Sequence, residues 1–314
     1  MAFYHEPVLL QEVLTWLNPR PEGVYCDGTL GGGGHSEAIL QACGGKAVLY
    51  GIDRDGDAIR AASERLRAYA GFTALQGNFH DAKALLREAG AGPLDGALLD
   101  LGVSSHQLDE GSRGFSYHED APLDMRMDQR QSMTAAELLN TAGETEIARI
   151  LREYGEEKWA ARIAHIICEH RAEKRLETTG DLVRAVDAAV PKAVRRREEG
   201  HPARRTFQAV RIAVNDELEP LEKALQDLMD CLKPGGRLCV ITFHSLEDRI
   251  VKQCFRKMEH PCICPPKAPV CTCGRKPVAK VMAGGAVSPS PEEVARNPRA
   301  RSAKLRVAEK RGEA

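Results

Sequence analysis

The 314-residue sequence lacks several features that would mark a special class of protein. No basic leader precedes a long apolar run, and the opening stretch carries Glu6, Gln11 and Glu12, so we expect neither a signal peptide nor a membrane span. It also lacks an excess of charge, because the formal net charge is −1. A polyanionic partner would therefore have to be bound by local basic patches. We find neither internal repeats nor low-complexity tracts.

Ten cysteines and 43% hydrophobic residues are present in this chain. Without a secretory leader, the cysteines are expected to be reduced thiols in a cytosol or metal ligands, so we expect a cytoplasmic protein. The hydrophobic content supports ordinary globular cores, and the length is sufficient for two domains.

Residues 27–35 read DGTLGGGGH, with five glycines in nine positions. Such a run costs backbone entropy and suits neither a helix nor a strand. Residues 23–27 are expected to form a buried strand, and a helix is expected to follow with Ser36 as its N-cap. A glycine-rich turn between a strand and a helix cradles a nucleotide-like ligand in doubly wound folds. We therefore predict a ligand lying against this backbone.

Three further expected strands lead to residues suited to the same ligand. Ligands of such sheets lie beyond the carboxyl ends of the strands, where an acid can accept hydrogen bonds from ribose hydroxyls. The expected strand 47–52 is followed by Asp53, the strand 72–76 leads to Phe79, and the strand 96–100 ends at Asp100.

Dinucleotides and S-adenosyl-L-methionine (SAM) are both bound by this architecture. A pyrophosphate prefers a helix N-terminus without nearby carboxylates, whereas Asp27 and Asp100 suit the cationic sulfonium and ammonium groups of SAM. The turn at 232–237 before an expected fifth strand at 238–243 resembles class I methyltransferases. We therefore predict an α/β fold of the class I SAM-dependent methyltransferase type, with a Rossmann-like doubly wound sheet. A nicotinamide (NAD)-dependent oxidoreductase is the alternative enzyme.

An insertion interrupts the expected sheet, because 135 residues lie between Leu101 and Arg237 where a crossover needs a dozen or more. Apolar faces beginning at Phe207 and Leu221 belong to the expected crossover itself. We predict a methyltransferase domain in two parts, 1–103 and 205–314, and an inserted all-helical substrate-recognition domain at 104–204.

Several helices are expected within the insert. Capping boxes are predicted to begin at Thr134, Thr141 and Thr178, with a helix after each of them. Another helix is expected over 156–173, and a last strand of the chain over 303–308.

Longer motifs then resemble one family, that of the ribosomal RNA small subunit methyltransferase H (RsmH or MraW). The likeness runs from His5 to about Ala308. The motifs that carry it are DLGVSS at 100–105, RGFS at 113–116, PLDMRMD at 122–128, RTFQAVR at 205–211, FHSLEDR at 243–249 and NPRARS at 297–302.

The resemblance implies SAM-dependent methylation of the exocyclic amino group, N(4), of a cytosine in the decoding region of bacterial 16S rRNA. The implied partner is small-subunit rRNA or the 30S particle, with no membrane and no DNA. A non-catalytic ribosome-assembly factor that binds RNA and holds SAM remains the alternative of another class. The implied cofactor contacts are Gly33, Gly34, His35, Asp53, Phe79, Asp100 and Gln107, of which His35 and Gln107 rest on the resemblance alone.

Methylation of a cytosine amino group needs hydrogen-bond acceptors, because its lone pair is shared with the ring. The turn after the fourth strand departs from the Asp/Asn-Pro-Pro-aromatic pattern of many amino-methyltransferases. The candidates are therefore Asp100 and the backbone carbonyls of Leu101 and Gly102. His244 and Ser245 are further catalytic candidates, although Ser245 also begins an expected capping box with Asp248.

Basic residues that could bind RNA phosphates occur in local runs. Arg204 and Arg205 are expected to open a helix, where positive charge opposes the helix dipole, so we predict that they bind rRNA. The alternative is a solvated charged face. A second basic stretch covers 296–306.

Four cysteines, Cys262, Cys264, Cys271 and Cys273, lie within twelve residues. Zinc suits four thiolates, but the usual spacing is Cys-x₂₋₄-Cys, and this one is tighter. We assign no metal ligand from the sequence, and redox-active or free thiols stay open.

Overall fold

The computed structural model describes residues 7–196, 200–265, 270 and 272–312. The chain forms two compact units, Met1–Gly102 with Leu218–Ala314, and Val103–Glu217. We call the first the sheet unit and the second the helical unit, and each is described by itself. No helix of the described residues is long and apolar enough to cross a membrane.

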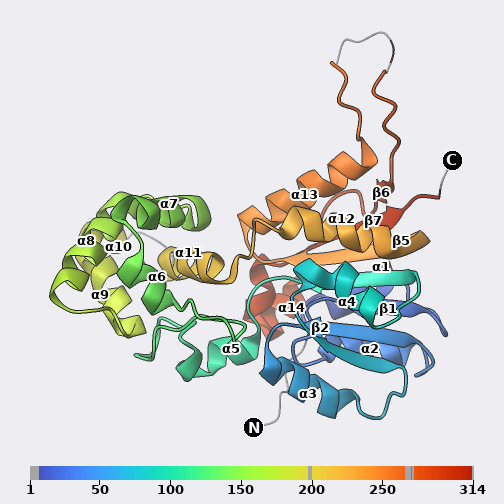
Figure 1. Cartoon of the computed structure of the whole chain (residues 1–314), viewed down its shortest axis with the longest axis horizontal. Coiled ribbons are helices and arrows are strands. Elements are labelled where there is room, and N and C mark those ends of the chain that lie inside the picture. The colour runs from blue at the N-terminus through green and yellow to red at the C-terminus, as the bar shows by residue number, and fades with distance from the viewer. Residues whose placement is uncertain (1–6, 197–199, 266–269, 271, 313–314) are drawn as a thin grey trace. The chain divides into compact units, whose positions relative to one another are not determined.

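A seven-stranded sheet with the order β3-β2-β1-β4-β5-β7-β6 forms the centre of the sheet unit (Figure 1). Strands β1 to β5 run parallel, whereas β7 is antiparallel to both β5 and β6. The strands are β1 Val24–Asp27, β2 Val48–Asp53, β3 Phe72–Gln76, β4 Leu94–Asp100, β5 Leu232–Thr242, β6 Ala279–Val281 and β7 Lys304–Lys310. All six strands expected from the sequence are confirmed, although β5 already begins at Leu232, within the expected turn.

Helices cover both faces of this sheet and give it two hydrophobic cores. Leu98 lies in the core with α1, α2 and α3, and its neighbour Leu99 lies in the core with α4, α12 and α13, because side chains alternate along a strand. This confirms the doubly wound class I fold. The helices are α1 Leu10–Leu17, α2 Gly34–Ala42, α3 Gly56–Leu66, α4 Ala82–Glu88, α12 Leu221–Cys231, α13 Ser245–Glu259 and α14 Pro291–Arg296.

The helical unit has its own hydrophobic core and no named strand among the described residues. Its helices are α5 Ser105–Asp109, α6 Ala135–Thr141, α7 Glu144–Gly155, α8 Ala160–Glu173, α9 Thr179–Ala189, α10 Lys192–Arg195 and α11 Arg204–Asn215. Phe207, Val210 and Val214 of α11 are buried in this core. The unit therefore extends to Glu217, whereas the sequence placed its end at 204 and assigned α11 to the crossover.

Two of the three expected helix starts agree with the structure. The Thr134 side chain accepts a hydrogen bond from the Glu137 N–H, and Thr178 forms a complete capping box with Asp181. The expected box at Thr141 is wrong, because Thr141 ends α6 and its hydroxyl donates to the Glu137 carbonyl, while Gly143 is the N-cap of α7. The Thr141 hydroxyl is therefore bonded within the last turn of α6 and does not cap α7.

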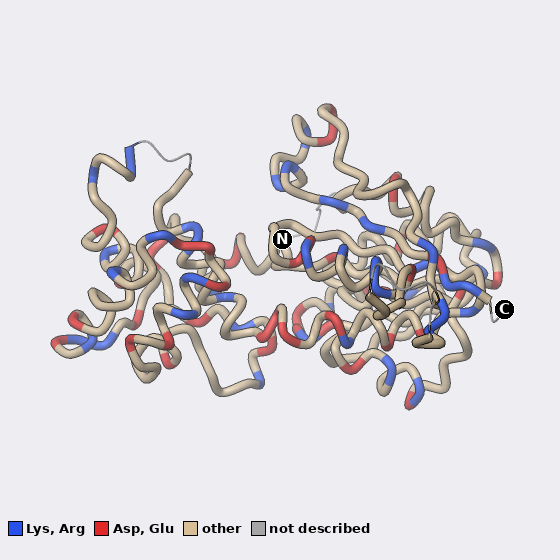
Figure 2. Tube along the Cα trace, turned by 90° about the horizontal axis from the view of Figure 1, so that it is seen from above, with Lys and Arg blue, Asp and Glu red and all other residues tan. Residues whose placement is uncertain are grey.

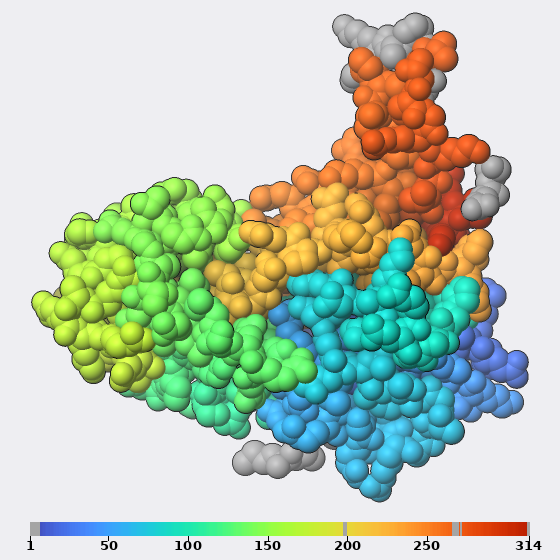
Figure 3. Space-filling view, in the orientation of Figure 1, coloured from blue at the N-terminus to red at the C-terminus, as the bar shows by residue number. Residues whose placement is uncertain are grey.

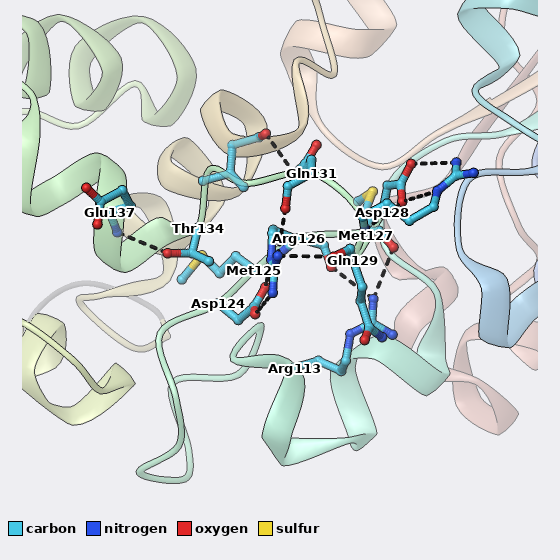
Figure 4. Close-up of polar contacts among 12 residues, drawn as sticks. Arg113, Asp124, Met125, Arg126, Met127, Asp128, Gln129, Gln131, Thr134 and Glu137 are labelled. Atoms are coloured by element: carbon cyan, nitrogen blue, oxygen red, sulfur yellow. Dashed lines mark hydrogen bonds and ion pairs between the residues drawn. The ribbon is translucent and has the colours of Figure 1, made fainter.

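The PLDMRMD motif at 122–128 forms a network of hydrogen bonds and ion pairs within the helical unit (Figure 4). Arg126 forms a bidentate ion pair with Asp124. The buried Arg113 side chain donates to the carbonyl oxygens of Arg126 and Met127 at 2.9 and 3.1 Å. The Asn215 amide at the end of α11 bonds to the Met125 carbonyl and the Met127 N–H. In the structure this motif therefore fixes a loop segment against α11.

Candidate functional site

The glycine-rich loop connects β1 to α2 at the carboxyl edge of the sheet. Gly31 and Gly33 have φ values of 50° and 77°, a left-handed conformation that favours glycine. Gly33, not Ser36, is the N-cap of α2. Ser36 lies within the first turn of α2, where its hydroxyl donates to Oδ2 of Asp27 at 2.7 Å.

Close packing requires the glycines at 33 and 34. A Cβ atom at Gly33 would lie 3.2 Å from the Ala62 Cβ, and one at Gly34 would lie 2.6 Å from the Pro7 Cγ. At Gly31, by contrast, the nearest atom is a backbone oxygen 3.9 Å away. Protein neighbours therefore account for Gly33 and Gly34, and the backbone is open to a ligand at Gly31.

Asp27 anchors the loop from beneath. Its side chain is 1% exposed, and it accepts hydrogen bonds from the Ser36 hydroxyl and the Thr29 N–H. Burial raises the pKa of this carboxyl to about 6, although the Ser36 hydrogen bond opposes the rise. Asp27 thus contributes charge below the loop rather than a surface for direct ligand contact.

Asp53 at the end of β2 connects two turns of the backbone. Its Oδ2 accepts the Gly31 N–H at 2.8 Å, and its Oδ1 accepts the Asp55 N–H at 2.9 Å. Burial raises the pKa of Asp53, and these two hydrogen bonds oppose that effect. Each carboxylate oxygen has a second lone pair, so Asp53 can still accept hydrogen bonds from ligand hydroxyls.

Asp100 ends β4, and the pKa of its carboxyl is strongly raised. Burial raises its pKa to about 8, and the negative charges of Asp27 and Glu247 add to the rise. Its Oδ1 is buried and has no hydrogen-bond partner among the described residues. Its backbone N–H donates to the Thr29 hydroxyl, which ties β4 to the glycine-rich loop.

His35 belongs to α2, lies beside Asp100 and is 7% exposed. Its Nε2 lies 3.0 Å from the Val8 carbonyl oxygen, and its Nδ1 lies 3.7 Å from Oδ2 of Asp100. Burial lowers the pKa of His35 to about 4, so the ring is neutral near pH 7. A carbonyl only accepts hydrogen bonds, so the ring proton is on Nε2 and Nδ1 presents a lone pair to Asp100.

The end of β5 adds His244 and Glu247. The expected capping box at Ser245 is wrong by one residue, because His244 is the N-cap of α13 and Glu247 is its partner. The His244 Nδ1 accepts the Glu247 N–H at 3.5 Å, and the Glu247 carboxylate accepts the N–H groups of Phe243 and His244. Ser245 is the exposed first residue of α13.

Glu247 was not among the predicted site residues, although it lies in the FHSLEDR motif. It is 2% exposed, and its charge helps to raise the pKa of Asp100, so it belongs to the same acidic edge. Only its position three residues after the N-cap could have indicated this burial from the sequence.

The remaining predicted residues lie in different surroundings. Phe79, in a short helical turn after β3, is 7% exposed and packs into the core, with its Cβ close to Gly28. Gln107 belongs to the helical unit, where its side chain accepts the Ser104 N–H and completes the capping box of α5. Arg204 and Arg205 begin α11, as predicted, and both are exposed.

A cationic ligand suits this edge of the sheet unit. The carboxyls of Asp27, Asp100 and Glu247 gather there, and the pKa of Asp100 is raised by burial and by the charges of Asp27 and Glu247. A bound cation would favour the ionised form of Asp100. The buried Oδ1 of Asp100 and the open backbone at Gly31 offer it a hydrogen-bond acceptor and a surface of approach.

Comparison with known proteins gives a family for this arrangement. The family model described as the MraW methylase family matches residues 2–311. The chain belongs to the MraW methylase family. A relative from Heliobacterium modesticaldum named ribosomal RNA small subunit methyltransferase H is 56% identical over 312 residues, which cover 99% of each chain. One of the same name from Symbiobacterium thermophilum is 55% identical over 308 residues, covering 98% and 96%.

The solved structures that resemble this MraW family member include an rRNA methylase from Streptococcus thermophilus. It is 12% identical, with a TM-score of 0.41 and coverage of 96% and 94%. Membership of the MraW family makes methyl transfer the reaction class and SAM the cofactor, and the acidic, partly open edge of the sheet fits a cationic cofactor. The NAD-dependent alternative is thereby set aside.

Proposed function

We propose that this protein transfers a methyl group from SAM to N(4) of a cytosine in the decoding region of bacterial 16S rRNA. The observation that carries the proposal is the full-length identity of 50 to 56% to proteins named ribosomal RNA small subunit methyltransferase H. Reduced cysteines and an rRNA substrate both agree with action in the cytoplasm.

The cofactor would be held at the carboxyl edge of the sheet unit. When bound, it supplies a methyl group on a cationic sulfonium. Each carboxylate oxygen of Asp53 accepts one backbone N–H, from Gly31 or Asp55, and its second lone pair would accept a hydrogen bond from a ribose hydroxyl. Asp100 would face the positive charge of the cofactor. The further proposed contacts of the chain are Gly33, Gly34, His35, Phe79 and Gln107.

Asp100 is also the strongest candidate to receive the substrate amino group. Its Oδ1 has no partner among the described residues, so it can accept an N–H and orient the nitrogen lone pair. Once a bound cation has ionised it, this carboxylate of raised pKa can also accept a proton. The Leu101 and Gly102 carbonyls remain the backbone alternatives.

His244 and Ser245 are weaker catalytic candidates than Asp100. The His244 Nδ1 is used by the helix cap, and its Nε2 lies 3.1 Å from Oε1 of Glu247. This arrangement supports a positioning role, in which the ring caps α13 beside the Glu247 carboxylate, whose charge adds to the effect of burial on the pKa of Asp100.

The helical unit, proposed from the sequence to recognise substrate, would bind rRNA or the 30S particle. Arg204 and Arg205 are exposed and have no ion pair with another described residue. Lys304 and Arg306 of the C-terminal basic stretch are instead paired with Asp248. Figure 2 shows basic and acidic residues interspersed along both units, so binding would depend on local groups. Neither a membrane nor DNA is a proposed partner.

The deciding experiment supplies radiolabelled SAM with 30S particles or naked 16S rRNA, followed by digestion and identification of the labelled nucleoside. Labelled N(4)-methylcytidine supports the proposal, and an Asp100→Asn variant is expected to produce much less of it. Tight SAM binding and particle binding without any transfer would instead identify an assembly factor that holds SAM. Label on another nucleoside would contradict the assigned position.

A further inference from the structure

An exposed arm between α13 and β6 lies outside the site described above. Its described residues are 260–265, 270 and 272–278, and none of their side chains is buried. Ile263, Val270 and Val278 are 66%, 69% and 50% exposed. Figure 3 shows this segment standing away from the rest of the sheet unit. The described part of the arm therefore has no hydrophobic core that would hold its two limbs together.

Three thiols nevertheless meet in this arm. The Sγ atoms of Cys262, Cys264 and Cys273 all lie within 4.8 Å of one another, and those of Cys262 and Cys273 are 3.9 Å apart. We propose that these three thiolates bind one Zn²⁺ ion, which ties the limb that leaves α13 to the limb that enters β6. Cys271 lies outside the described residues, so the site is built on the other three cysteines.

The sulfur spacing agrees with a tetrahedral thiolate site. A Zn–S bond of about 2.3 Å places two ligand sulfurs of a tetrahedron roughly 3.8 Å apart. A disulfide would need about 2.05 Å. The 3.9 Å between Cys262 and Cys273 is therefore close to the edge of a zinc tetrahedron.

The tight Cys-x-Cys spacing has a geometric explanation. Cys262 and Cys264 lie in a segment without helix or strand assignment, before the first gap in the described arm. Cys264 lies at a bend of this segment, and its sulfur lies within 4.8 Å of that of Cys262. Two thiolates two residues apart can therefore face one ion, whereas the longer spacing of common zinc knuckles follows from their turns.

A backbone donor supports the thiolate form of Cys264. The Thr272 N–H donates to the Cys264 Sγ at 3.4 Å, and the Thr272 hydroxyl lies 3.8 Å from the same sulfur. Hydrogen bonds of this kind orient metal-ligating groups and stabilise their charge. They also link the two limbs of the arm across the proposed metal, since Thr272 precedes Cys273.

The proposed zinc is structural, because α13 separates it from the candidate active site. His244 caps the N-terminal end of α13, and the arm begins after its last residue, Glu259. At 1.5 Å per residue, the 15 residues of α13 span about 22 Å. Loss of the metal should therefore leave SAM binding intact, which separates this inference from the proposed function.

The test measures zinc in the full-length protein, purified without a metal-binding tag, by inductively coupled plasma mass spectrometry. We expect about one zinc per chain in the wild type and a loss of most of it in Cys262→Ser and Cys273→Ser. A matched Cys168→Ser variant, which changes a half-buried thiol of α8, should keep its zinc. Circular dichroism and SAM calorimetry verify that each variant is folded.

Spectroscopy then tests the ligands. Cobalt substitution should produce sulfur-to-metal charge-transfer bands and the visible bands of a tetrahedral site, and X-ray absorption should give metal–sulfur distances of about 2.3 Å. A wild-type protein without zinc that fails to bind added zinc or cobalt would overturn the proposal. Unchanged zinc in both arm variants, or a disulfide between arm cysteines under reducing purification, would do the same.

Discussion

The Nδ1 atom of His35 lies 3.7 Å from Oδ2 of Asp100, while Nε2 of the same ring lies 3.0 Å from the Val8 carbonyl oxygen. The histidine is neutral, because burial lowers its pKa to about 4, and Asp100 holds a proton at pH 7, because its pKa is raised to about 8. The pair is thus uncharged until a cation makes ionisation of Asp100 favourable. This neutral pairing predicts that the binding of a cationic ligand at the edge depends on pH.

The first prediction is that SAM affinity falls as the pH falls from 8.5 to 6.5. Below its pKa, Asp100 must lose a proton before it can face a cation, so affinity should decrease by up to about tenfold per pH unit. Calorimetry in buffers of different ionisation enthalpy measures the released proton. The Asp100→Asn variant should bind SAM weakly and without proton release, and the ammonium group of SAM titrates in the same way for both proteins. Equal proton release by both would rule out Asp100 as its source.

A second prediction concerns the stability of the ligand-free protein. A carboxyl whose folded pKa is raised destabilises the fold above its unfolded pKa, so the penalty from Asp100 grows from about pH 4 and is complete above about pH 8. Asp100→Asn removes this penalty, so its gain in Tm over the wild type should increase across that range. At pH 8 we expect a gain of roughly 2 °C or more. Thermal unfolding at several pH values measures it, and a gain that shrinks with rising pH would contradict the assigned shift.

A third prediction tests whether Asp53 binds the cofactor in addition to supporting two backbone turns. Asp53→Ala loses the charge and the acceptors of the Gly31 and Asp55 N–H groups, so SAM affinity should fall at least about tenfold. Asp53→Asn keeps one acceptor oxygen and should lose less thermal stability than the alanine variant. Glu64→Gln, on the exposed side of α3, provides a control of equal charge change. Unchanged SAM affinity in both Asp53 variants would remove Asp53 from the cofactor site.

A fourth prediction tests why Gly33 is a glycine. Gly33→Ala combines an unfavourable left-handed conformation with a contact of 3.2 Å to the Ala62 Cβ, so it should destabilise the protein by about 1–3 kcal/mol. Gly90→Ala is the matched control, because Gly90 has φ 71° and no atom within 4 Å of an added Cβ. Chemical denaturation should show a larger loss for Gly33→Ala. Equal losses would mean that backbone conformation alone requires the glycine.

A fifth prediction concerns rRNA binding by the helical unit. Changing both Arg204 and Arg205 to Ala should leave SAM affinity intact and weaken rRNA binding. If each neutralises one phosphate, the slope of log K against log salt should shrink by roughly 1.5–2. Arg152→Ala with Arg162→Ala, exposed on α7 and α8, controls for net charge. The same slope in the wild type and the Arg204/Arg205 variant would mean that these arginines form a solvated face.

Local pattern in the sequence determined much of the fold. Apolar runs that end in acids or polar residues located six strands, and the glycine-rich turn predicted a ligand at the carboxyl edge of the sheet, because both signals depend on a few neighbouring residues. The strand β6, of three residues, was not predicted, because only its pairing with β7 makes it a strand. The family motifs of the sequence also identified the methyltransferase family, which the family model confirms.

Tertiary packing decided what the sequence left open, because a pattern shows that a face is apolar or charged but not what that face meets. The apolar stripe of α11 suited either unit, and burial of Phe207 and Val210 assigned it to the helical unit. The space at Gly33 is limited by Ala62, a residue of α3 whose Cβ would lie 3.2 Å from an added Cβ. Burial raises the pKa of Asp100, and the charge of Glu247, 147 positions away in the sequence, adds to the rise through a proximity that only the folded sheet unit creates.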